Sequence, residues 1–175
     1  MSIHIPTWVN GILQPVEKLE AHQKGLKHKA ISVFLVRDGH TLLQRRALGK
    51  YHTPGLWANA CCTHPYWDED SLTCAERRLE EELGIRGLDL MFRDTVEYRA
   101  DVGNDLIEHE IVDLFFGQLA QDFEYTLNSD EVDSIKWVQI HALPDLVRRN
   151  PEEFTPWLRI YVDQFSDLIF GKELV

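Results

Sequence analysis

The feature that most constrains the fold is a helical repeat of apolar side chains in residues 71–83, followed at once by a glycine. Side chains three and four positions apart lie on one face of a helix, so this segment carries an apolar stripe that other parts of the chain must cover. The stripe consists of Leu72, Ala75, Leu79 and Leu83. Ser71 or Asp70 can cap the start of this helix, and Gly84 can end it.

Apolar segments rich in β-branched residues, before and after this helix, predict the strands that it would cover. They are residues 30–36, 41–44, 96–100, 107–119 and 132–140. Asn10-Gly11 is typical of a hairpin turn, and residues 56–62 fit a short strand or loop. We expect two more helices at residues 143–149 and 155–170. This order predicts an α/β or α+β fold with a mixed β-sheet packed between helices.

The size and charge of the chain limit the class of protein further. A chain of 175 residues with 44% hydrophobic residues suits a single domain with its own core. Its net charge of -11 argues against binding to nucleic acid or to an anionic membrane. A phosphate-containing substrate would therefore need a metal ion or a local cluster of Lys and Arg. The start of the chain lacks a signal peptide, and no apolar run could span a bilayer, so we expect a cytoplasmic protein.

Two adjacent cysteines lie in the stretch NACCTHP, residues 59–65. A disulfide between Cys61 and Cys62 is disfavoured by its geometry and by an odd cysteine count, and their spacing does not fit a structural zinc site. On an extended segment successive side chains alternate, so Cys62 and His64 share a face while Cys61 points to the other. We therefore expect Cys62 to face a site, and Cys61 and Cys74 to pack in the core.

Histidines and glutamates supply a possible metal site. His22 and His28 come just before the first long strand, and Glu108 and Glu110 lie two apart on a predicted strand, so both carboxylates project from one face. Two like charges side by side favour a cation between them. With His64, these side chains suit manganese, zinc or magnesium with more than four ligands. Each histidine alone has an ordinary alternative as a surface or core residue, which we expect for His4, His40, His52, His109 and His141.

Residues 63–85 resemble the Nudix box, the signature of a family of diphosphate-processing proteins. The positions that match the box are Glu69, Arg77, Leu79, Glu81, Glu82, Gly84 and Ile85. Two positions depart from it: Thr63 replaces a Gly, and Arg78 replaces a Glu that helps Nudix hydrolases hold magnesium. Arg78 removes a carboxylate from the metal cluster and adds a phosphate-facing donor. The resemblance therefore implies binding of a metal–diphosphate complex more than its hydrolysis. Arg78 and Glu82, four apart, could instead be a solvated surface pair.

Over nearly its whole length the chain looks like the type I isopentenyl-diphosphate delta-isomerases, a Nudix-fold family. The motifs that carry this resemblance are RRALGKYHTPGLWANACCTHP (45–65), ERRLEEELGI (76–85), YRA and EHE (98–110) and TPW (155–157). The family interconverts isopentenyl and dimethylallyl diphosphate in isoprenoid biosynthesis, by protonation and deprotonation. The resemblance implies one domain over residues 1–175. Its Nudix-like core would cover about 28–160, with an N-terminal extension at 1–27 and a C-terminal helix at about 155–170.

The resemblance also implies a role for each candidate residue. Cys62 and Glu110 would be the catalytic acid/base pair, and Tyr98 would support Glu110. The first metal site, for Mn²⁺, Zn²⁺ or Mg²⁺, would consist of His22, His28, His64, Glu108 and Glu110. Glu82 and the main-chain carbonyl of Cys62 would bind a Mg²⁺ that touches the diphosphate. The phosphates would be held by Lys18, Arg46, Lys50 and Arg78. Trp157 would face the hydrocarbon, where an indole ring can stabilise a cation.

Two other functions fit parts of the sequence. A Nudix hydrolase would release phosphate with magnesium and would not need Cys62. A non-enzymatic zinc module would use Cys61, Cys62 and His64, although its cysteines are wrongly spaced. For the isomerase we expect a monomer that binds a small isoprenoid diphosphate and neither nucleic acid nor a membrane.

Overall fold

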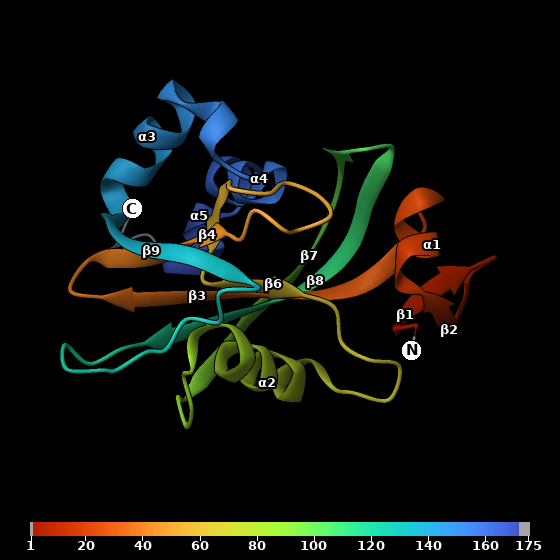
Figure 1. The fold of residues 1–175 in the computed structure, drawn as a ribbon, viewed down its shortest axis with the longest axis horizontal. Coiled ribbons are helices and arrows are strands. Elements are labelled where there is room, and N and C mark those ends of the chain that lie inside the picture. Colours follow the sequence, from red (N-terminus) through yellow and green to blue (C-terminus); the bar gives the residue numbers. More distant parts are fainter. Residues whose placement is uncertain (1, 172–175) are drawn as a thin grey trace.

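The computed structural model describes residues 2–171, which form one mixed β-sheet with helices on both faces (Figure 1). The strands are β1 (His4–Val9), β2 (Ile12–Glu17), β3 (Lys27–Arg37), β4 (His40–Arg46), β5 (Trp57–Asn59), β6 (Cys61–Thr63), β7 (Leu90–Gly103), β8 (Leu106–Gln118) and β9 (Val132–Gln139). The helices are α1 (Lys18–Gln23), α2 (Ser71–Leu83), α3 (Leu143–Arg149), α4 (Pro156–Gln164) and α5 (Ser166–Phe170). Two short 3-10 turns, Ile140–Ala142 and Pro151–Glu153, flank α3.

Strand β3 is the centre of the sheet. It pairs in parallel with β8 and antiparallel with β1, β4 and β6, while β7 pairs antiparallel with β8 and β9 with β4. The sheet is therefore mixed, as the sequence predicts. Among residues 2–171, none of the helices has the length and apolarity needed to cross a bilayer.

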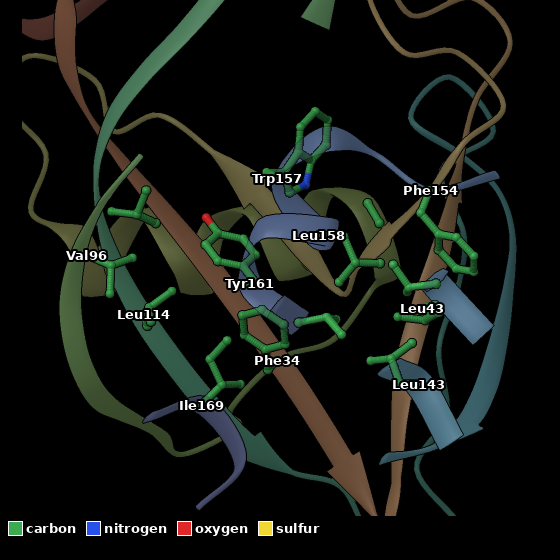
Figure 2. Close-up of a cluster of buried hydrophobic side chains, with 14 of the residues drawn as sticks. Phe34, Leu43, Val96, Leu114, Leu143, Phe154, Trp157, Leu158, Tyr161 and Ile169 are labelled. Atoms are coloured by element: carbon green, nitrogen blue, oxygen red, sulfur yellow. The ribbon is translucent and has the colours of Figure 1, made fainter. Parts of the chain in front are cut away.

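The two faces of β3 contribute to two separate hydrophobic cores. Ala30, Phe34 and Val36 face one core together with α3, α4 and α5, whereas Ile31, Val33 and Leu35 face α2. Figure 2 shows the first core, in which the ring of Phe34 of β3 meets that of Tyr161 of α4 edge-on, with 5.5 Å between the ring centres. A strand buried on both faces reads as a continuous apolar run, which explains why it is visible in the sequence.

Helix α2 covers the opposite face of the sheet (Figure 1) and has the predicted boundaries. The side chain of Asp70 accepts a hydrogen bond from the backbone N–H of Thr73, so Asp70 rather than Ser71 is the cap. Gly84 ends the helix in the left-handed conformation, with a φ of 69°.

Three parts of the chain differ from the sequence-based expectation. The helix expected at 155–170 is two helices, α4 and α5, because Phe165 leaves the helical region with a φ of -128°. Residues 56–62 contain parts of two short strands, β5 and β6, rather than one. Helix α1, which has six residues, was not anticipated because a helix this short leaves little periodicity in the sequence.

Candidate active site

One pocket brings together most of the site residues that the sequence predicts. Those that line it are Lys18, Arg46, Lys50, Cys62, His64, Arg78, Glu82, Tyr98, Glu108, Glu110 and Trp157. They come from α1, α2, α4, four strands and the loops between them, so only the folded chain assembles the set. His22 and His28 lie beside the pocket, where their ring nitrogens approach those of His64 and an oxygen of Glu110.

The imidazoles of His22 and His28 are oriented alike by the backbone. Nδ1 of His22 lies 2.7 Å from the carbonyl oxygen of Lys18, and Nδ1 of His28 lies 2.7 Å from that of Leu26. Each Nδ1 therefore carries the proton that it donates, and each Nε2 keeps its lone pair. Both Nε2 atoms are buried and have no hydrogen-bond partner within the described residues. Buried, unpaired lone pairs of this kind are what a metal ion would satisfy.

Glu110 faces the same cluster. Its Oε1 lies 2.9 Å from Nε2 of His64 and 3.6 Å from Nε2 of His28. Three imidazoles and one carboxylate thus surround one point, with ligand atoms within 4.8 Å of one another. These nitrogen and oxygen donors fit a divalent transition metal or Mg²⁺.

Glu108 and Glu110 project from the same face of β8, whereas His109 points away and meets Glu97. The Tyr98 hydroxyl lies 2.8 Å from Oε2 of both glutamates and can donate to either. The two Oε1 atoms are thereby left facing the imidazoles. Glu108, however, groups with His22 and His52 rather than with the four-residue cluster.

The pKa values of the two glutamates are shifted in opposite directions. Burial, together with the negative charge of Glu110, raises the pKa of Glu108 well above its usual range. Burial acts on Glu110 as well, but its contacts with His28 and His64 outweigh this effect and hold its pKa well below the usual range. Burial lowers the pKa of His22 to about 4, which keeps that imidazole neutral near pH 7. Without an added cation, the site therefore favours one proton on the pair of carboxyls.

Cys62 occupies the pocket, and Cys61 does not. Cys61 is fully buried in the core under α2, while Cys62 packs partly against the other core. The alternation expected on an extended segment is thus confirmed. Because the two thiols face opposite sides of the sheet, they cannot bind one ion together with His64, which contradicts the geometry of a zinc module.

The Cys62 thiol has polar neighbours that the sequence did not point to. Its Sγ lies 2.9 Å from Oδ1 of Asn59 and 2.9 Å from Oγ of Ser32, and Ser32 in turn lies 2.8 Å from the hydroxyl of Tyr161. Burial raises the pKa of the Cys62 thiol, and the hydrogen bond with Ser32 opposes that rise. One feature of the sequence could have pointed to these neighbours: Ser32 interrupts a run of hydrophobic residues in strand β3.

A cluster of cations lies on the other side of the pocket. Lys18, Arg46, Lys50 and Arg78 all line it. Burial, and then repulsion from the other three, lowers the pKa of Lys18 to about 8. The Nε atoms of Arg46 and Arg78 are buried donors for which the structure of residues 2–171 provides no acceptor. The cluster is thus prepared to receive an anion with several oxygens.

Two carboxylates balance part of this charge. Arg78 donates to Glu82 at 2.6 Å and lies 3.3 Å from Glu131, which also pairs with Lys50. Glu82 is buried, and its second oxygen accepts a hydrogen bond from Gln44 at 2.7 Å. The pair of Arg78 and Glu82 is therefore part of the pocket and not a solvated surface pair.

Trp157 closes the pocket at the start of α4. Its ring is 2% exposed, with the guanidinium of Arg46 at 5.2 Å and the ring of His52 edge-on at 5.9 Å. Its Nε1 is buried without a partner among residues 2–171. His52 itself is 4% exposed, so it is buried, one of the two ordinary placements expected for it, and its side chain also lines the pocket.

Three further positions of the box, Glu69, Arg77 and Glu81, stabilise the helix. Arg77 binds Glu69 through two hydrogen bonds, at 2.6 and 2.8 Å, and also reaches Glu81 on the next turn. These contacts tie the loop before α2 to the helix, outside the pocket.

The fold and the pocket belong to a known class of protein. The family model of the NUDIX domain matches residues 26–158. Solved structures agree on the fold. DR0079 from Deinococcus radiodurans superposes with a TM-score of 0.72 at 12% identity, covering 92% of this chain and 98% of that one. A MutT NUDIX hydrolase from Burkholderia pseudomallei gives a TM-score of 0.61 at 24% identity, covering 79% and 98%.

Relatives of similar length are much closer in sequence. The isopentenyl-diphosphate Delta-isomerase of Jannaschia sp. (strain CCS1) is 62% identical over 170 residues, 97% of each chain. That of Ruegeria pomeroyi is 58% identical over 175 residues, covering 100% of this chain and 97% of the other. The chain belongs to the NUDIX family and, within it, to the family of the isopentenyl-diphosphate Delta-isomerases.

Proposed function

We propose that this protein interconverts isopentenyl diphosphate and dimethylallyl diphosphate. The observation that carries the proposal is the pairing, in one pocket, of a thiol and a carboxylate with a cationic cluster. A metal-assisted hydrolase needs carboxylates around its magnesium and has no use for a thiol. The names of the relatives support the same reaction.

The reaction needs one proton to be added and another to be removed. Protonation of the terminal alkene carbon places positive charge on the neighbouring tertiary carbon, and loss of a proton from the carbon beyond it forms the new double bond. Atoms and charge balance, so no further reactant is required. We assign the two proton transfers to Cys62 and Glu110, with donor and acceptor exchanged in the reverse reaction. Positioned acids and bases of this kind contribute about 10²–10⁴-fold each.

Tyr98 is a positioning residue in this scheme. Its hydroxyl lies 2.8 Å from Oε2 of Glu110. This hydrogen bond would hold the carboxylate in the orientation in which Oε1 faces the histidines. Glu110 would then hold or release its proton at a defined oxygen atom. Trp157 would present its indole ring to the hydrocarbon part of the substrate, where an aromatic ring stabilises positive charge by about 0.5–2 kcal/mol.

The diphosphate would bind to the cationic cluster. Lys18, Arg46, Lys50 and Arg78 provide the donors, and this binding energy is remote from the reacting carbons. Arg46 and Arg78 each retain an unpaired buried Nε donor, which supports a phosphate ligand at this end of the pocket. The substrate would thus be oriented with its hydrocarbon toward Cys62 and Trp157.

Two metal sites would complete the pocket. Mn²⁺, Zn²⁺ or Mg²⁺ would be held by His22, His28, His64, Glu108 and Glu110, and Mg²⁺ by Glu82 with the main-chain carbonyl of Cys62. The unpaired Nε2 atoms of His22 and His28 support the first site. When bound, these ions supply positive charge that offsets the buried carboxylates and the diphosphate.

We further propose that the protein acts as a cytoplasmic monomer on a free small molecule, with no nucleic acid or membrane involved. Three free cysteines support a reducing compartment, and the net charge of -11 disfavours polyanionic partners.

The test compares the wild type with Cys62→Ala. Cys61→Ala, which removes the neighbouring thiol, is the matched control. With isopentenyl diphosphate and magnesium, we expect the wild type and Cys61→Ala to form the allylic isomer without releasing phosphate. Cys62→Ala should lose at least about 100-fold in rate. Release of phosphate by the wild type, at a rate unaffected in Cys62→Ala, would instead establish a hydrolase.

A further inference from the structure

An apolar groove lies next to the active-site pocket, between the start of the chain and α1. It has a volume of about 320 Å³ and is lined by Ser2, Ile3, Glu17, Lys18, Leu19 and Tyr51. Its three large apolar side chains are partly open to solvent, since Ile3 and Leu19 are 44% exposed and Tyr51 is 42% exposed. None of the three belongs to either hydrophobic core of residues 2–171. Apolar side chains that gather in one exposed groove are typical of a binding site.

The groove is continuous with the active-site pocket. Lys18 and Tyr51 line both, and Nζ of Lys18 lies 5.6 Å from the centre of the Tyr51 ring. Ile3 also borders a second opening onto the cationic cluster, which Lys50 and Arg78 line as well. The carbonyl oxygen of Ile3 accepts a hydrogen bond of 2.9 Å from the backbone N–H of Lys18, which ties the segment before β1 to the start of α1. A ligand that contacts the cations can therefore reach the groove directly.

The charges along the groove favour a ligand with an anionic head and an apolar tail. The cationic cluster stands at one end of the groove, where Lys18 belongs to both. Glu17 is the one acidic residue in the described lining. Its Oε2 accepts a hydrogen bond of 2.9 Å from the backbone N–H of Glu20, as the N-cap of α1. An anion at the cations and a hydrocarbon in the groove would each meet a complementary surface.

The catalytic end of the pocket is closed to a long hydrocarbon chain. Trp157 is 2% exposed and Tyr98 is 7% exposed, and both belong to the first hydrophobic core. A tail cannot extend past these two rings without displacing packed core side chains. A long tail must therefore leave the pocket at another side, and the groove begins at Lys18 and Tyr51.

We propose that the groove binds the tail of an isoprenoid diphosphate longer than the five-carbon substrate, with the diphosphate on the cationic cluster. The proposal rests on the proposed function for the identity of that anion. Neither Cys62 nor Glu110 is among the described residues that line the groove, so a tail bound there is not isomerised. The longer diphosphate competes with the substrate for the cations and acts as an inhibitor.

The test measures binding by isothermal titration calorimetry in the presence of magnesium, and it does not depend on turnover. The probes are geranyl diphosphate, which has a ten-carbon tail, and inorganic diphosphate, which has none. The variants Ile3→Ser and Leu19→Ser each remove one apolar wall of the groove. Leu168→Ser is the matched control, because Leu168 is also 44% exposed but lies on α5, away from the groove lining. Circular dichroism verifies that each variant is folded.

We expect the wild type and Leu168→Ser to bind geranyl diphosphate at least about 10-fold more tightly than inorganic diphosphate, because burial of the tail is favourable. In Ile3→Ser and Leu19→Ser this preference should fall about 5-fold or more, while the affinity for inorganic diphosphate stays unchanged.

Equal affinities of the wild type for the two ligands would overturn the proposal. A preference that persists in a folded groove variant would place the tail elsewhere and would overturn it too, and so would an equal loss of affinity for both ligands. Each of these results leaves the isomerase assignment standing. A wild type that binds neither ligand would instead remove the anion site of the proposed function, and the groove proposal with it.

Discussion

The Cys62 thiol lies in a chain of hydrogen bonds whose direction is fixed at one end. Both amide hydrogens of Asn59 are used, since Nδ2 donates to the carbonyl oxygens of Val33 and Cys61. Its Oδ1 must therefore accept, and the S–H of Cys62 donates to it. The hydroxyl of Ser32 then donates to Sγ, while that of Tyr161 donates to Ser32. When the thiol loses its proton, the donor from Ser32 remains and stabilises the thiolate.

Replacing Ser32 by alanine should make the Cys62 thiolate less stable. A hydrogen bond to a charged group contributes about 1.5–3 kcal/mol, so the thiolate fraction should fall about 10-fold or more. The rate of alkylation by iodoacetamide at pH 9 measures this, because Cys61 and Cys74 are fully buried. Ser134→Ala, which removes a hydroxyl that donates to Asp133 and does not line the pocket, should alkylate like the wild type. An unchanged alkylation rate in Ser32→Ala would contradict the proposed donation from the Ser32 hydroxyl to Sγ of Cys62.

At the scale of residues, the sequence predicts what depends on local periodicity. The opposite orientations of Cys61 and Cys62 follow from alternation along a strand and needed no knowledge of the fold. Ser32 and Tyr161 are 129 positions apart, and only the packing of α4 on β3 brings them together. The position of His52 in the lining of the pocket could not be predicted for the same reason. It lies in an irregular loop, so no spacing relates it to Glu108.

At the scale of elements, the C-terminal end of α2 positions the cationic side of the pocket. The carbonyl oxygens of Glu82 and Leu83 accept hydrogen bonds from the backbone of Asn128 and Thr126. The loop held in this way leads to Glu131, which pairs with Lys50 and Arg78 in the pocket. Gly84 permits this arrangement, because a Cβ there would lie 2.9 Å from the backbone nitrogen of Thr126.

Gly84→Ala should therefore destabilise the protein more than Gly87→Ala. Both glycines have a positive φ, 69° and 63°, but a Cβ at Gly87 would meet nothing within 4 Å. The left-handed conformation alone costs about 1–2 kcal/mol in a non-glycine residue. The clash with Thr126 should add about 1–3 kcal/mol in Gly84→Ala. Urea denaturation measures the difference, and equal losses in the two variants would refute the role given to Thr126.

The elements differ in how well the sequence predicts them. Helix α2 has a full apolar stripe, a capping residue and a terminal glycine, and its bounds were predicted correctly. Helix α1 is too short to be stable alone and depends on burial of Ala21 and His22. The break between α4 and α5 was not predicted, because Phe165 continues the apolar pattern and its backbone departs from the helix only in the packed structure.

At the scale of the whole molecule, an acidic protein encloses a cationic site. The net charge is -11, yet four Lys and Arg side chains gather in one pocket. Mutual repulsion is the consequence, and it contributes to lowering the pKa of Lys18 to about 8, after burial itself. A bound diphosphate would relieve this repulsion and favour the protonated amine, so binding and protonation of Lys18 are linked.

The affinity for inorganic diphosphate should accordingly fall as the pH rises through 8. Below pH 8 Lys18 is already protonated and attracts the anion, whereas above pH 8 binding must take up a proton. For one proton, the affinity falls by at most about 10-fold per pH unit. Isothermal titration calorimetry at pH 7 to 10 measures this affinity. The variant Lys18→Gln serves as the reference, because it shows the pH dependence that comes from ionisation of diphosphate itself. Identical pH profiles for the two proteins would show that Lys18 is not the linked group.

The central claim, that this pocket moves protons at carbon, is tested most directly in deuterated water. The protein is incubated with isopentenyl diphosphate and magnesium, and the product is examined by NMR spectroscopy and for free phosphate. We expect dimethylallyl diphosphate that carries deuterium from the solvent, with no phosphate released, and a rate at least about 100-fold lower for Cys62→Ala. Release of phosphate from a substrate whose double bond is unmoved and carries no deuterium would contradict it.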